Sequence, residues 1–112
     1  MKLSSRVKIL QDNGTIKEVK GSKVEYNKNG ITLPLIVHES VEAWETELLK
    51  ISEETTGLGM CIIKDKKAHK VSKDDIINAV DNFIKEHSIE KIREVIQNTK
   101  TISEREELLT ND

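Results

Sequence analysis

The chain has 112 residues, enough for a single domain over 1–112, and its modest core is set by 36% hydrophobic and 34% charged residues. A net charge of −2 excludes a strongly basic or acidic protein. The sequence contains no run of about 18 apolar residues, so no membrane span is predicted. One cysteine cannot form an internal disulfide, so we expect a reducing, cytoplasmic location. The abundance of Ile, Lys and Asn is typical of an AT-rich bacterial or phage genome.

The first third of the chain predicts a three-stranded antiparallel meander. Strands over 7–10 and 15–26 flank Asn13-Gly14, a strong hairpin signal because both positions tolerate positive φ. A second turn over 27–30 leads to the nearly continuous apolar strand 31–37. These tight turns require antiparallel neighbours and therefore exclude a parallel, doubly wound sheet.

Two residues predict irregularities in this meander. Gly21 interrupts the long second strand where its apolar alternation shifts, which indicates a bulge or a bend. Pro34 has no N–H to donate, so the third strand is expected to lie at an edge or to bulge there.

The next segment predicts a helix that crosses the meander. Ser40 suits the N-cap and Gly57 suits the position after the last turn. The apolar stripe of a buried helix face is formed by Val41, Trp44, Leu48 and Ile51. Acidic residues flank this stripe on both sides and are expected to form a solvated face: Glu39, Glu42, Glu45, Glu47, Glu53 and Glu54.

A short β-hairpin is expected after this helix. The apolar run 59–63 reads as a strand, 65–67 can turn, and 68–71 can return as its partner. Cys61 lies within the apolar strand, where a small core residue is a stronger interpretation than a nucleophile.

The phase of the apolar pattern breaks near the C-terminus. Ser72 can cap a helix, and its apolar face comprises Ile76, Ile77, Val80, Phe83 and Ile84. A second stripe would lie roughly 140° away on an unbroken helix, so we predict two helices with a corner at His87 and Ser88. A capping box from Ser103 to Glu106 predicts a short helix or a frayed tail over 100–112.

The second stripe is also the predicted interface. It consists of Ile89, Ile92, Val95 and Ile96, and left in water it would form an apolar patch of the kind that marks contacts. We therefore predict self-association, with a homodimer as the simplest form, or contact with a protein partner. The competing interpretation is that the corner folds this helix back onto the meander, or that Leu108 and Leu109 cover the stripe.

A lysine-rich run over 64–73 gives the alternative function. As a basic hairpin it would contact phosphates through Lys64, Lys66, Lys67, Lys70 and Lys73. The run contains no arginine and no aromatic residue, which weakens both base reading and stacking on single strands. A solvated hairpin edge explains the same residues without a ligand.

No pattern of catalytic, cofactor-binding or metal-binding residues is visible. His38, His69 and His87 form no i, i+4 pair, and no CxxC accompanies them. We expect an α+β fold with a three-stranded meander, a crossing helix, a short hairpin and two C-terminal helices. The predicted function is a small non-enzymatic binding or regulatory protein without cofactor, metal or membrane, and the alternative is a nucleic-acid-binding accessory protein.

Overall fold

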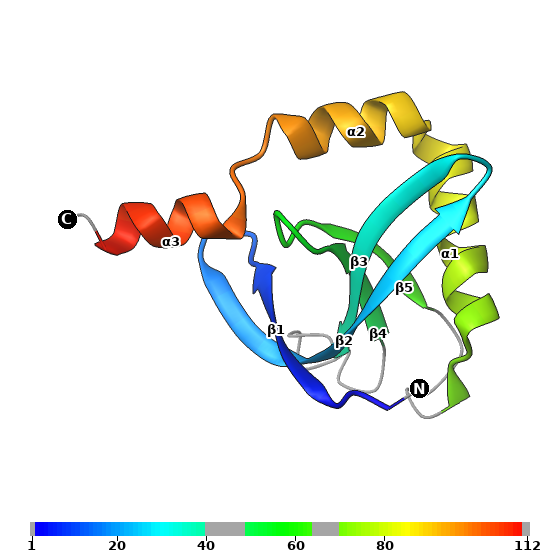
Figure 1. Ribbon diagram of the computed structural model, residues 1–112, viewed down its shortest axis with the longest axis horizontal. Coiled ribbons are helices and arrows are strands. Elements are labelled where there is room, and N and C mark those ends of the chain that lie inside the picture. The colour runs from blue at the N-terminus through cyan, green and yellow to red at the C-terminus, as the bar shows by residue number, and fades with distance from the viewer. Residues whose placement is uncertain (1, 40–48, 64–69, 111–112) are drawn as a thin grey trace.

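A computed structural model describes residues 2–39, 49–63 and 70–110, and it confirms an α+β fold (Figure 1). Five antiparallel strands form one sheet in the order β1-β2-β3-β4-β5. The strands are β1 (Ser5–Leu10), β2 (Ile16–Lys28), β3 (Ile31–Glu39), β4 (Leu49–Glu53) and β5 (Gly59–Ile63). The helices are α1 (Lys73–His87), α2 (Ile89–Gln97) and α3 (Ile102–Thr110). Within the described ranges, no helix is both long and apolar enough to cross a membrane.

The sheet is strongly coiled, and Gly21 is the point at which it turns. Gly21 lies opposite both Ser5 of β1 and His38 of β3, so one strand serves two ladders. The β1–β2 ladder covers 16–21 of β2 and the β2–β3 ladder covers 21–28, so both ladders end at Gly21 and neither contains a register shift. The predicted bend is visible as the curve of β2 (Figure 1). The curl brings the end of β1 to the β4–β5 turn, where the Leu10 amide donates to the Gly57 carbonyl at 3.0 Å.

The coiled sheet encloses a small apolar cluster and carries a larger one on its other face. Val7, Ile9 and Ile36 form the small cluster, against which Val19 packs. The larger cluster joins β3, β4 and β5 to α1, and its buried members include Leu35, Val37, Leu49, Ile51, Ile76 and Val80. Because β3 is covered on both faces, its sequence is a nearly continuous apolar run.

Pro34 lies in a central strand, which corrects the expectation of an edge or bulge. β3 pairs with β2 on one side and with β4 on the other. The β3–β4 ladder begins at Leu35, and the Pro34 carbonyl accepts a bond from the Glu54 amide at 2.9 Å. The missing N–H therefore falls where the ladder ends, so no paired donor is lost.

The predicted crossing helix is wrong over its last part. Leu49–Glu53 is the strand β4, paired with both β3 and β5, while 40–48 lies outside the described residues. Gly57, expected after the helix, has φ +73° in the β4–β5 turn instead. The predicted hairpin is also corrected, because β5 pairs with β4 and Val71 is not in a strand. Lys70 is not in a strand either, and the rest of the predicted return strand, 68–69, lies outside the described residues.

The corner between the last two predicted helices is confirmed. α1 ends at His87, α2 begins at Ile89, and Ser88 between them has φ 63° and ψ 146°. The Ser88 hydroxyl accepts from the Lys91 amide, as expected of an N-cap. Ser72 caps α1 through a capping box with Asp75.

α3 begins beside β1 and the β4–β5 turn and projects away from the sheet (Figure 1). The Ile102 amide donates to the Thr55 carbonyl at 2.8 Å, and Lys8 donates to the Glu106 carboxylate at 2.8 Å. The capping box pairs Thr101 with Glu104, not Ser103 with Glu106. The helix thus begins two residues earlier than its sequence signal indicates.

Candidate functional site

A groove of about 560 Å³ runs between the edge strand β5 and helix α1. The strand contributes residues 60–63. The helix contributes residues spaced three or four apart, which lie on one face: Asp75, Asn78, Ala79, Asn82, Phe83 and Glu86. Figure 1 shows β5 beside α1 at the end of the sheet. The groove is therefore floored by an extended backbone and walled by a helix.

The outer edge of β5 carries backbone groups that the sheet does not use. β5 is the last strand of the sheet, and its ladder to β4 occupies one edge. Within the described ranges, no other strand pairs with it. Backbone N–H and C=O groups of alternate residues point to opposite edges, so part of those in 60–63 face the groove. Such an edge is a template for pairing with another extended chain.

An apolar pocket of about 150 Å³ adjoins the groove at the corner between α1 and α2. It shares Met60, Phe83 and His87 with the groove, so the two form one continuous depression. The His87 ring lies against Phe83 with the ring centroids 4.5 Å apart. The rest of its apolar lining comes from Leu58, Ile92, Val95 and Ile96.

The predicted interface residues thus divide between the core and this pocket. Ile92 is 6% exposed, while Ile89 and Ile96 are partly buried against the larger cluster. Val95 is 48% exposed at the pocket rim. The corner folds α2 back onto the sheet, so the stripe needs no second molecule to cover most of it. Self-association through these residues stays a prediction.

A buried glutamate, Glu53, contributes to the lining of the pocket. Glu53 is 1% exposed, although the sequence pattern predicts a solvated side chain. Its carboxylate accepts from the Thr55 hydroxyl at 2.7 Å, and from the Thr56 amide and hydroxyl at 3.1 and 2.9 Å. These donors replace water, which is what allows a carboxylate to be buried. The Glu-Glu-Thr-Thr-Gly turn is the sequence signal that could have indicated this arrangement.

The charges along the groove are acidic. Asp75 accepts from the Ser72 amide at 2.8 Å, and Glu86 lies 3.9 Å from the exposed His87 ring. No described residue that lines the groove is Lys or Arg, and Lys91 lines only the adjoining pocket. Burial, with a smaller contribution from Glu86, raises the pKa of the Cys61 thiol to about 11. The thiol is therefore protonated at neutral pH and unsuited to nucleophilic attack.

A second polar pair lies inside the coiled sheet, away from the groove. His38 Nε2 is 2.7 Å from Ser52 Oγ, and His38 Nδ1 is 2.8 Å from the Glu39 carbonyl. Since the carbonyl can only accept, Nδ1 donates to it and Nε2 accepts from the serine. Burial lowers the pKa of His38 below 6.5. His38 is 1% exposed and Ser52 is 2% exposed, so the hydrogen bond between them pairs two polar groups that are buried in the core.

The other predicted site residues are only partly described. Lys64, Lys66 and Lys67 lie outside the described residues, as does His69. Lys70 and Lys73 are exposed, just before and at the start of α1. In the part of the chain that the structure describes, no three His, Cys, Asp or Glu side chains gather into a metal site. Comparisons with family models, curated proteins and solved structures found no match for this chain.

Proposed function

We propose that this chain is a non-enzymatic protein-binding domain that takes up an extended segment of a partner protein beside β5. The outer edge of β5, which pairs with no other described strand and faces a helix across a groove, is the observation that carries the proposal. Addition of a strand to such an edge is a recurring mode of peptide recognition, in which backbone bonds give affinity and pockets select side chains. A cytoplasmic location, drawn from the single cysteine, belongs to the same proposal.

The pocket at the helix corner supplies the selectivity for an apolar side chain. Its volume of about 150 Å³ matches a cavity that accepts a benzene-sized group. A Leu or Phe of the bound segment would rest against Phe83, Ile92 and Ile96 and bury apolar area there. The rest of the segment would lie along 60–63.

The charge of the groove selects the segment further. Asp75 and Glu86 line the groove near its two ends, because they lie near the start and the end of α1 respectively. A segment with Lys or Arg beside its apolar anchor would meet these carboxylates, whereas an acidic segment would be repelled. The proposed ligand is therefore extended, apolar at one position and basic around it.

The test is selection of heptapeptides by phage display on the immobilised chain, followed by fluorescence anisotropy with the selected peptides. Ala79→Trp fills the groove from its helix wall and should weaken binding at least tenfold. Lys85→Trp places the same ring on an exposed position of α1 outside the groove and should leave binding unchanged. Circular dichroism melts would show that both variants fold.

Hydrogen exchange provides a second readout that does not depend on the variants. Bound peptide should slow amide exchange within 60–63, because groove-facing amides gain a partner. Peptides that bind equally well to both tryptophan variants, or that leave exchange in β5 unchanged, would overturn the proposal.

A second copy of the chain is the competing occupant, in line with the predicted homodimer. Light scattering of the free chain at high micromolar concentration measures this directly, and a mass near 12.7 kDa excludes it. Ile92→Glu is a poor probe of such a dimer, because Ile92 is buried within one chain and a charge there would unfold it.

A further inference from the structure

We infer that the outer side of the β1–β2 hairpin binds the sugar–phosphate backbone of double-stranded nucleic acid, independently of the peptide groove. Side chains of β1 alternate between the interior and the solvent. Val7 and Ile9 are buried in the small apolar cluster, and Arg6 and Lys8 therefore point outward. Lys20 of β2 lies directly opposite Arg6 and is also exposed.

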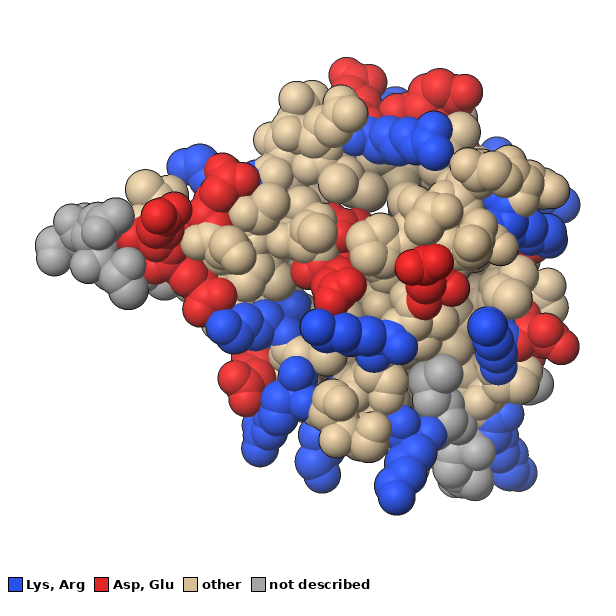
Figure 2. Space-filling model, in the orientation of Figure 1, with Lys and Arg blue, Asp and Glu red and all other residues tan. Residues whose placement is uncertain are grey.

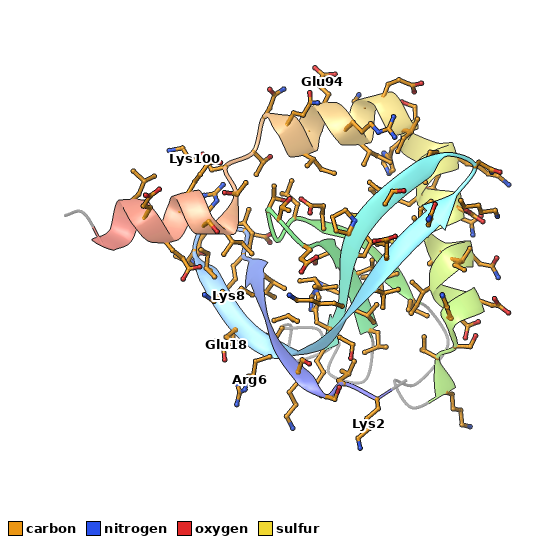
Figure 3. The ribbon with its side chains drawn as sticks, viewed as in Figure 1. Lys2, Arg6, Lys8, Glu18, Glu94 and Lys100 are labelled. Atoms are coloured by element: carbon orange, nitrogen blue, oxygen red, sulfur yellow. The ribbon has the colours of Figure 1, made fainter. Side chains whose placement is uncertain are left out.

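Further cations extend this surface, here named the basic rim and defined as Lys2, Arg6, Lys20, Lys70 and Lys73. The Lys2 carbonyl accepts from the Ser22 hydroxyl at 2.9 Å, which fixes the N-terminal residues beside β2. Figure 3 shows Lys2 and Arg6 directed away from the sheet along one edge of the molecule. Figure 1 places the start of α1, with Lys73, at the same edge, and basic side chains line it in Figure 2.

The basic rim is poorly neutralised by the protein itself. Arg6 is 3.8 Å from Glu18, and both side chains are more than half exposed, so this pair contributes little. No described carboxylate forms an ion pair with Lys2, Lys20, Lys70 or Lys73. Like charges directly opposite one another, as in Arg6 and Lys20, destabilise a sheet. An anionic ligand would offset that repulsion. Solubility alone does not require two cations on directly opposite positions.

The composition of the rim favours a duplex over a single strand. Binding to single strands relies on aromatic side chains that stack on bases. Among the described residues, Tyr26 is buried and bonded to Asp81, while Phe83 lines the groove. Flexible lysines on a strand edge can contact phosphates without reading bases. The expected binding is therefore indifferent to sequence and steeply dependent on salt.

Fluorescence anisotropy with a labelled 24-base-pair duplex tests this inference. If each of the five cations meets one phosphate, the plot of log K against log salt has a slope of about −4.5. Affinity should then fall about 500-fold between 50 and 200 mM salt. The double variant Arg6→Glu/Lys20→Glu should weaken binding more than tenfold at 50 mM salt. Arg6→Gln/Lys20→Gln removes both contacts without adding charge and should lower the slope by about 2.

Lys85→Glu/Lys100→Glu makes the same change of charge away from the rim and is the matched control. Figure 3 shows Lys100 between α2 and α3, far from Lys2. Equal loss of affinity in the control and rim variants would overturn the placement of the site. Absence of duplex binding at 50 mM salt, tighter binding to a single strand, or binding to anionic lipid vesicles alone would each overturn the inference. None of these outcomes bears on peptide binding beside β5.

Discussion

Replacing Gly21 by alanine should open the sheet at the point where it turns. An added Cβ would lie 2.6 Å from Val7 Cγ2, 2.7 Å from the Val37 carbonyl oxygen and 3.1 Å from His38 Cβ. The valine methyl can rotate, but the carbonyl belongs to a strand paired on both sides and cannot move alone. Relief therefore requires β1 and β3 to move away from β2 at this residue. Overpacking of this kind typically costs about 1–3 kcal/mol.

Urea unfolding followed by far-ultraviolet circular dichroism measures this cost. Gly59→Ala is the matched control, because nothing lies within 4 Å of its added Cβ and its φ is ordinary. That variant should be neutral or more stable by about 0.4–1 kcal/mol, since alanine restricts the unfolded chain. If Gly21→Ala were within 0.5 kcal/mol of the parent protein, the close approach of the three strands at this residue would be refuted.

Two further predictions concern groups whose pKa is shifted by burial. Because burial lowers the pKa of His38 below 6.5, the unfolded chain takes up a proton first as the pH falls. The free energy of unfolding should be constant above pH 6.5 and decrease below it, by at most about 1.4 kcal/mol per pH unit. His38→Gln should abolish that dependence between pH 7.5 and 5.5 in urea titrations, and an unchanged slope would contradict it. Cys61, with a pKa of about 11 against an ordinary 9.0, should react with a disulfide reagent at pH 7.5 roughly tenfold more slowly than free cysteine, because a roughly 100-fold smaller thiolate fraction is partly offset by greater nucleophilicity. A rate equal to that of free cysteine would show that this thiol is not buried.

Features set by local backbone chemistry could be predicted from the sequence. Gly14 has φ 82° in the first hairpin turn, and the Asn-Gly pair indicates it without any tertiary information. The corner at Ser88 follows from the change in phase between the two apolar stripes. It also follows from the Ser88 hydroxyl, which accepts a hydrogen bond from the amide three residues later. Both signals involve residues that lie close together in the chain.

Features set by contacts between residues distant in the sequence could not be predicted. Ile51 fits the spacing of a helix face, but its neighbours Leu49 and Ser52 are also buried, which a strand between two others allows. The sequence pattern predicts that Glu53 is exposed, because the threonine hydroxyls that donate to its carboxylate reach it only after the turn has formed. The groove beside β5 depends on which strand β5 pairs with, and the sequence pattern predicts 68–71 as its partner, whereas the observed partner is β4. Three residues of the predicted stripe on α2 line the pocket, but the sequence did not indicate that this pocket adjoins a groove.

The order of the strands has a consequence for how quickly the chain can fold. Every strand pairs with the one before or after it in the sequence, so each step of sheet growth closes a short loop. Short loops cost little entropy, and folding rates rise as the mean sequence separation of contacts falls. Longer closures include those of β1 with Gly57, of Tyr26 with Asp81 and of Lys8 with Glu106. The nucleus is therefore expected in the β2–β3–β4 hairpins, with β1 curling over and α3 docking after the rate-limiting step.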